Sequence, residues 1–242
     1  MSIKHKIRKA LWRIGYDISR FNSTSHPLAR RKALLDSYNI HLVLDVGANT
    51  GHFAEQMRND IGYSGDIISF EPLSSEFELL KEKTGNDKKW KAINCAIGDV
   101  EEKSEINIAG NSYSSSILSM LESHEKSAPE SKYVGQETID VKTLDSIMED
   151  LSINEASIYL KIDTQGFESK VIKGAEMSLN RIDTIQLEMS LSPLYKDELL
   201  FNELYNILCS KGYTLVALEP GFSDSNSGQM LQIDGIFHRF LS

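Results

Sequence analysis

Residues 42–51 read LVLDVGANTG, a short apolar run that passes through an acid into a turn with a glycine near each end. The next residues, 52–59, have the apolar spacing of a helix. A strand that passes through a glycine turn into a helix brings backbone N–H groups close to a bound ligand. The dinucleotide pattern GxGxxG fails, because Asn49 and His52 stand where its second and third glycines would be. Asp45 can accept hydrogen bonds from an ammonium group, so the turn suits a ligand with an amino-acid moiety; an ordinary strand–helix turn is the alternative.

Strand-like and helix-like segments alternate after this turn. Apolar runs typical of strands occur at 42–46, 67–70, 90–95, 157–162, 184–189, 213–218 and 230–240, and residues 104–109 are typical of a short exposed strand. Helical spacing is found at 52–59, 74–84, 167–174 and 196–210. This alternation predicts an α/β fold, in which a mostly parallel sheet has helices on both faces. The last two strands follow each other without a helix, which predicts one antiparallel edge strand.

Two further strand ends carry residues suited to a nucleoside. Glu71 follows the second strand, where an acid can accept hydrogen bonds from both hydroxyls of a ribose. Pro72 lacks an N–H and ends that strand. The third strand ends at residues 94–99, where an adenine ring can lie between small and apolar side chains. Together with the glycine turn, these strand ends suit a nucleoside that carries an amino-acid group, and we therefore expect S-adenosylmethionine as the ligand. Taken alone, Glu71 could instead be a solvated acid at the end of a strand.

The order of the motifs resembles that of a known family. They are LDVGANTG (44–51), FEP (70–72), NCAIGD (94–99), SSSIL (114–118), TLD (143–145), LKIDTQGFE (160–168), QLEMS (186–190) and DGIFHR (234–239). Together they resemble the FkbM family of methyltransferases over roughly residues 40–240. The resemblance implies a class I methyltransferase fold, which is a Rossmann-like, doubly wound, mostly parallel seven-stranded sheet. It also implies S-adenosylmethionine as methyl donor, and O-methylation of a sugar or natural-product hydroxyl. Many members of this family carry an acid at the position of Gln165, which bears on any acid–base or metal role there.

The resemblance also implies which residues hold the cofactor. The glycine turn would hold its methionine end, Glu71 its ribose, and residues 94–97 and 114–116 its adenine. The expected cofactor contacts are Asp45, Gly47, Ala48, Asn49, Gly51, Glu71, Pro72, Asn94, Ala96, Ile97, Ser114, Ser115 and Asp163. Without the resemblance, the serine run at residues 114–116 would be interpreted as a flexible loop.

Three acids are candidates for catalysis. Asp163 and Glu188 end the fourth and fifth strands of the predicted sheet, and Glu168 begins the helix that follows Asp163. Methyl transfer to a hydroxyl needs a group that takes its proton, and Asp163 is the first candidate, followed by Glu188. The carboxylates could instead bind Mg²⁺ or Mn²⁺ and so orient the hydroxyl. A third alternative is that Asp163 only caps the following helix.

The N-terminal segment differs in charge from the rest of the chain. Residues 1–32 contain nine Lys or Arg and one acid, a net +8, whereas the whole chain of 242 residues carries -9. Apolar residues between Ile3 and Phe21 fall on one side of a helix. We therefore expect an amphipathic helical arm over residues 1–38 and a methyltransferase domain over residues 39–242. The arm could dock on the domain or a second subunit, or rest on an anionic membrane surface or near an anionic substrate.

Composition narrows the function classes further. The overall negative charge disfavours nucleic acid as a partner. Two distant cysteines suggest neither disulfides nor zinc and fit the cytoplasm, with membrane association left open. The leading hypothesis is a methyltransferase acting on a carbohydrate or other small hydroxyl acceptor. Methylation of nitrogen or of a lipid-linked acceptor, and a binding module with reduced catalysis, are the alternatives.

Overall fold

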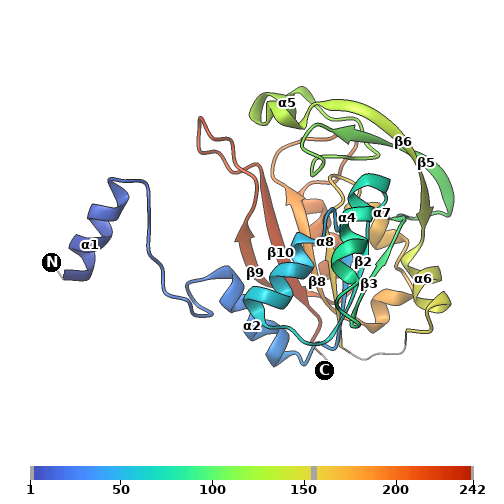
Figure 1. The fold of residues 1–242 in the computed structure, drawn as a ribbon, viewed down its shortest axis with the longest axis horizontal. Helices are drawn as coiled ribbons and strands as arrows, with labels where there is room; N and C mark the ends of the chain where they lie inside the picture. Colours follow the sequence, from blue (N-terminus) through green and yellow to red (C-terminus); the bar gives the residue numbers. More distant parts are fainter. Residues whose placement is uncertain (1–2, 154–156, 241–242) are drawn as a thin grey trace.

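A seven-stranded sheet forms the centre of the computed structural model, which describes residues 3–153 and 157–240 (Figure 1). The strand order is β3-β2-β1-β7-β8-β10-β9. The bounds are β1 (Leu42–Val46), β2 (Asp66–Phe70), β3 (Trp90–Ile93), β7 (Ile158–Ile162), β8 (Ile182–Ser190), β9 (Thr214–Pro220) and β10 (Gln232–His238). Adjacent strands from β3 to β8 are parallel, and β10 runs antiparallel to both β8 and β9. The predicted class I methyltransferase architecture is therefore confirmed. The antiparallel strand lies one place in from the edge, because β9 takes the edge position.

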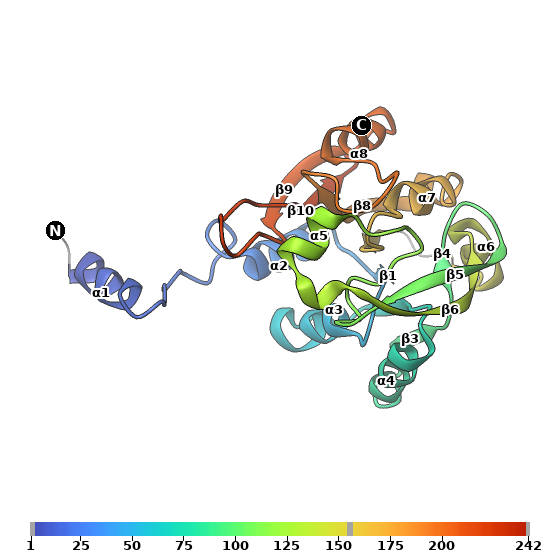
Figure 2. The ribbon, with the colours of Figure 1, turned by 90° about the horizontal axis from the view of Figure 1, so that it is seen from above.

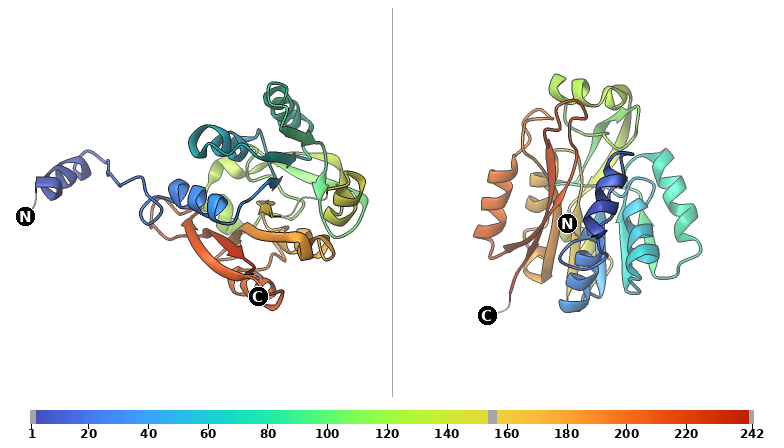
Figure 3. Two further views of the ribbon diagram at one scale, coloured as in Figure 1. Left: turned by 90° about the horizontal axis from the view of Figure 1, so that it is seen from below. Right: turned by 90° about the vertical axis from the view of Figure 1, so that its left-hand side faces the viewer.

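Helices cover both faces of this sheet (Figure 3). The helices are α2 (Pro27–Ser37), α3 (His52–Gln56), α4 (Ser74–Thr84), α6 (Leu144–Asp150), α7 (Glu168–Lys173) and α8 (Phe201–Ser210), and α3 continues as a π-helical turn, Met57–Ile61. One core contains Leu44 of β1 together with side chains of α6, α7 and α8, and the opposite core contains Val43 of β1 with side chains of α2, α3 and α4. Successive residues of a strand face opposite sides, so every residue of β1 is buried.

A second, smaller sheet lies over the carboxyl ends of the main strands (Figure 1). It consists of β4 (Ala96–Ile97), β6 (Tyr133–Lys142) and β5 (Glu102–Ala109) in that order, and the short helix α5 (Glu122–Ser127) lies beside it. The sequence indicated only part of it, the exposed strand at 104–109. Many residues of β6 are polar and exposed, so it lacks the apolar run by which core strands are recognised.

The N-terminal helix is present but shorter than its apolar spacing indicated. Helix α1 (Ile3–Trp12) ends where Gly15 adopts a left-handed conformation with φ of 81°. Helix α2 lies within the predicted arm and is anchored on the body, because its Leu35 belongs to the same core as Val43 of β1. The part that extends from the body is therefore the segment before α2 (Figure 2). The division at residue 38 stays a prediction. Residues 1–2, 154–156 and 241–242 of the two predicted domains lie outside the described residues.

Candidate active site

A cavity of about 290 Å³ opens at the carboxyl ends of the parallel strands. This is the edge at which open α/β sheets bind ligands. Nine of the predicted site residues line it: Gly47, Asn49, Glu71, Pro72, Ala96, Ile97, Ser115, Asp163 and Glu188. Apolar side chains such as Phe70 and Ile106 form further parts of its wall. The cavity therefore combines an apolar interior with a few carboxylates, as a nucleoside site requires.

The glycine turn brings two strand ends into close contact. Gly47 has φ of 77°, and a Cβ placed on it would lie 1.8 Å from the carbonyl oxygen of Asp163. Only glycine fits this approach between the ends of β1 and β7. Asn49 also has a positive φ, and its side chain donates a hydrogen bond to Ser112 Oγ at 3.1 Å. The turn thus connects the main sheet to the serine-rich segment above it.

Glu71 is a buried carboxylate at the cavity wall. Its two oxygens accept hydrogen bonds from the backbone N–H groups of Asn49 (2.7 Å) and Leu73 (2.9 Å). Burial raises the pKa of Glu71 from 4.5 to about 7, although both hydrogen bonds act in the opposite direction. This carboxylate is therefore placed and oriented before any ligand binds. Its contact with a ribose stays a prediction.

The remaining predicted residues lie outside the cavity lining. They are Asp45, Ala48, Gly51, Asn94, Ser114 and Glu168. Asn94 donates hydrogen bonds to the carbonyls of Glu71 and Pro72, and so supports the loop that carries the carboxylate. Glu168 accepts hydrogen bonds from the backbone of Thr164 and Gly166, and its burial raises its pKa to about 7. Direct roles for these six residues in binding or catalysis stay predictions.

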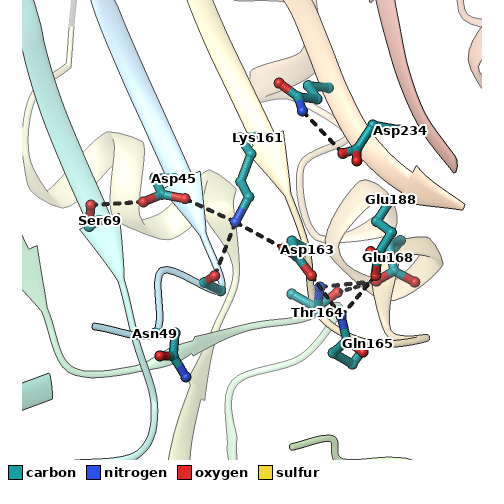
Figure 4. Close-up of polar contacts among 12 residues, drawn as sticks. Asp45, Asn49, Ser69, Lys161, Asp163, Thr164, Gln165, Glu168, Glu188 and Asp234 are labelled. Atoms are coloured by element: carbon teal, nitrogen blue, oxygen red, sulfur yellow. Dashed lines mark hydrogen bonds and ion pairs between the residues drawn. The ribbon is translucent and has the colours of Figure 1, made fainter. Parts of the chain in front are cut away.

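A buried lysine lies between Asp45, at the end of β1, and Asp163, at the end of β7 (Figure 4). Lys161 Nζ lies 3.2 Å from Asp45 Oδ1 and 3.3 Å from Asp163 Oδ2. It also donates a hydrogen bond to the carbonyl of Gly47 at 3.1 Å. Asp45 has no exposed surface and accepts a further hydrogen bond from Ser69 Oγ at 3.1 Å. Lys161 was missed as a functional residue, although a lysine within the apolar strand IYLKI is itself a signal.

Gln165 separates Asp163 from Glu188. Its Nε2 donates hydrogen bonds to Asp163 Oδ1 and Glu188 Oε2, both at 2.8 Å (Figure 4). Its Oε1 accepts a hydrogen bond from the hydroxyl of Tyr195 at 2.8 Å, which orients the amide with its N–H groups toward the two acids. Gln232 donates a second hydrogen bond to Glu188. The sequence contained no signal for Tyr195 or Gln232, because they reach the site from distant segments.

The two acids differ in their surroundings. Burial and the nearby charges of Asp163 and Asp234 raise the pKa of Glu188 well above its usual range. Asp163 keeps 37% of its side chain exposed and faces the ammonium of Lys161. These surroundings therefore favour the neutral form of Glu188, whereas the carboxylate of Asp163 lies beside an ammonium group. Two carboxyl groups in such different environments suit different tasks.

The donor set does not fit a metal ion between these acids. The position that a cation would share between Asp163 and Glu188 is taken by the Nε2 of Gln165, which presents N–H donors. In the described part of the chain, no three His, Cys, Asp or Glu side chains are arranged to hold a metal ion. We therefore derive no step through Mg²⁺ or Mn²⁺.

Comparison with known families identifies the chain. The model of the FkbM methyltransferase domain matches residues 45–215, which spans the glycine turn, the cavity and α8. The chain belongs to the FkbM family of S-adenosylmethionine-dependent methyltransferases. The resemblance stated from the sequence is confirmed. A search among curated proteins found no match.

Solved structures of similar fold are distant in sequence. A candidate O-methyltransferase from Klebsiella pneumoniae is 10% identical, with a TM-score of 0.50 over 99% of this chain and 91% of that one. The magnesium protoporphyrin IX methyltransferase of Synechocystis, with bound S-adenosylmethionine, is 8% identical, with a TM-score of 0.47 over 99% and 98% of the two chains. An rRNA methylase from Streptococcus thermophilus is 9% identical, with a TM-score of 0.47 over 89% and 98%. At these identities the likeness concerns the fold alone.

Among the residues that the structure describes, no helix has the length and apolar character needed to span a bilayer.

Proposed function

We propose that this FkbM methyltransferase transfers the methyl group of S-adenosylmethionine to a hydroxyl oxygen of a carbohydrate or related small molecule, with Asp163 as the proton acceptor. The observation that carries the proposal is the pair Asp163 and Glu188 at one cavity, with Gln165 between them and Lys161 behind. An aliphatic hydroxyl is a weak acid, so a positioned carboxylate assists its attack on carbon. The family implies the same acceptor class.

The residues of the turn fit the cofactor. The cradle at Gly47 has no room for a side chain, and Glu71 presents a buried carboxylate to the same cavity. Gly47 and Asn49 would hold the methionine end, Glu71 the ribose, and Ala96 and Ile97 the adenine. When bound, S-adenosylmethionine supplies a methyl group on a positively charged sulfur. The protein contributes orientation, exclusion of water and a place for the proton.

Each residue of the acid pair has a separate task in this mechanism. When a hydroxyl acceptor receives the methyl group, its proton would pass to the carboxylate of Asp163. Gln165 and Lys161 hold that carboxylate in place, and neither competes for the proton because both are donors. In its neutral form, which burial favours, Glu188 can donate a hydrogen bond to the acceptor and so position it. Each of these tasks follows from the charge state and the partners of the group.

The proposal is tested by incubation with methyl-labelled S-adenosylmethionine and a panel of sugars, amines and lipid-linked saccharides. Transfer to a sugar hydroxyl, located by NMR of the methyl ether, is the expected result. Label on nitrogen, or only on the lipid-linked acceptors, would replace the proposed acceptor class. Cofactor binding without transfer to any compound would favour a binding module. Activity that is lost with a chelator and regained with Mg²⁺ or Mn²⁺ would contradict the metal-independent role of Gln165.

A further inference from the structure

The segment before α2 exposes an unusual set of apolar side chains. Helix α1 and the residues that follow it stand away from the body in two perpendicular views (Figures 1 and 2). The exposed large side chains of this segment are Ile7 (54%), Trp12 (49%), Ile14 (67%), Tyr16 (68%), Ile18 (64%) and Phe21 (61%). Six large apolar residues exposed within fifteen consecutive positions mark an interaction surface rather than a solvated one.

Part of this surface has a definite shape. Ile7 and Leu11 are one helical turn apart on α1, and Ile18 returns toward them from the following segment. The three side chains line an open hollow whose remaining walls include Arg8 and Arg20. An apolar floor beside the guanidinium group of Arg20 fits a ligand that carries both hydrocarbon and negative charge.

The charges of the segment select the kind of partner. The basic residues between positions 5 and 25 are Lys6, Arg8, Lys9, Arg13 and Arg20, against a single acid, Asp17. Asp17 is used internally, since its carboxylate pairs with Arg8. The other basic side chains are exposed and lie among the apolar ones. An amphipathic, basic and aromatic segment of this kind is typical of proteins that lie on a membrane surface.

We propose that residues 3–25 bind the surface of an anionic phospholipid membrane. These residues are the part of the predicted arm that precedes α2, and from here on the arm means this part alone. The apolar side chains enter the boundary between head groups and acyl chains, and the lysines and arginines contact lipid phosphates. The body of a second copy is acidic and would satisfy the charges of the arm. However, its exposed apolar side chains, such as Leu79 of α4, Val134 of β6 and Leu218 of β9, come from separate elements. A lipid surface satisfies the charge and the apolar area together.

The test is co-sedimentation of the full chain with vesicles. One set contains phosphatidylcholine alone, and the other contains equal parts of phosphatidylcholine and phosphatidylglycerol. We expect binding at least about tenfold tighter to the anionic set, weakened by added salt, because each basic residue near such a surface contributes roughly a fivefold factor. Equal binding to both sets, or binding to neither, would overturn the proposal.

Matched charge variants locate the effect. The double variant Arg13→Gln/Arg20→Gln removes two exposed charges of the arm and is expected to weaken vesicle binding by at least about tenfold. The control Lys88→Gln/Lys132→Gln removes two exposed charges of the body and is expected to change binding less than about threefold. An equal loss in both variants would show a non-specific charge effect and contradict the arm as the site.

Tryptophan fluorescence reports insertion independently. The chain has two tryptophans, of which Trp12 is 49% exposed and Trp90 is buried at 7%. Anionic vesicles are expected to shift the emission to shorter wavelength, and Trp12→Phe to abolish the shift. A shift that persists in Trp12→Phe would place the contact elsewhere.

The variant Ile18→Ser separates membrane binding from self-association. It is expected to weaken vesicle binding without changing the molecular mass measured by sedimentation in the absence of lipid. A mass lower than that of the wild type would show that the arm binds a second copy instead. Cofactor binding should be equal in all arm variants, which separates this test from that of the methyltransferase proposal.

Discussion

We predict that the buried carboxylate of Glu71, as the proposed partner of the ribose, makes cofactor binding depend on pH. In the ligand-free protein the pKa of Glu71 is raised by burial from 4.5 to about 7. Ribose hydroxyls donate their hydrogen bonds most strongly to an ionised carboxylate. Binding of S-adenosylhomocysteine should therefore select the ionised form. A protonated Glu71 has to lose its proton when the ligand binds.

The size of the expected change in cofactor affinity follows from this pKa. With a pKa of about 7, roughly one molecule in ten is ionised at pH 6 and almost all at pH 8. The dissociation constant should therefore be about tenfold larger at pH 6 than at pH 8, and level above about pH 8. The raised pKa corresponds to about 3 kcal/mol of lost stability once both the folded and the unfolded state are ionised, since one unit is about 1.4 kcal/mol. Because the folded protein holds a proton that the unfolded chain has already lost, the free energy of unfolding should fall as pH rises from about 4.5 to about 7.

Isothermal titration calorimetry between about pH 5.5 and 8.5 measures both the affinity and the protons released. Glu71→Gln should abolish the pH dependence and weaken binding at pH 8 by about tenfold or more, as a charge-assisted hydrogen bond is lost. Glu168→Gln is the matched control, because Glu168 is also buried with a pKa raised to about 7 but does not line the cavity. It should alter the pH dependence of stability and leave that of binding in place. An affinity that is constant across this range, or a dependence that survives Glu71→Gln, would refute the assignment.

Two further predictions concern the turn and the buried lysine. Gly47→Ala should abolish cofactor binding as measured by calorimetry, because the added Cβ would lie 1.8 Å from the carbonyl oxygen of Asp163. Gly62 has the same φ of 77° but open space around it, so it is the control. Gly62→Ala should keep cofactor binding and lower the free energy of unfolding by only about 1 kcal/mol. Unchanged binding in Gly47→Ala would contradict the close approach of the two strand ends. Lys161→Met should lower the free energy of unfolding, measured by urea denaturation, by about 3–5 kcal/mol, because it leaves the buried charge of Asp45 unpaired. Adding Asp45→Asn to this variant removes that charge and should restore part of the lost stability. No restoration would mean that the lysine acts through packing instead.

The sequence predicted those parts of the site that depend on local patterns. The glycine turn and Glu71 could be placed because a parallel sheet brings the ends of its strands to one edge, whatever the details of packing. The pairing of Asp45 with Lys161 depends on the register of β1 and β7, in which these residues lie opposite each other. Nothing in either segment alone states that register. A charged residue in an apolar strand was the available signal.

Other parts depended on distant segments and were beyond such reasoning. Tyr195 reaches Gln165 from the segment between β8 and α8, where no regular pattern fixes the path of the chain. Strand β6 was missed because its polar, exposed residues resemble a loop. The N-terminal helix was predicted too long, because apolar spacing continued past the turn at Gly15. In each case the spacing of residue types was insufficient without knowledge of the neighbouring segment.

The most direct test of the proposed chemistry compares cofactor affinity with turnover in Asp163→Asn. Asparagine keeps the size of the side chain but cannot take the proton of the acceptor hydroxyl. We predict a dissociation constant for S-adenosylhomocysteine within a few fold of the wild type, and a turnover with the hydroxyl acceptor lowered by about 10²-fold or more. Glu188→Gln, which keeps a neutral group able to donate a hydrogen bond, should lower turnover much less. Full activity of Asp163→Asn would contradict the account and leave Asp163 with a structural role at the end of β7.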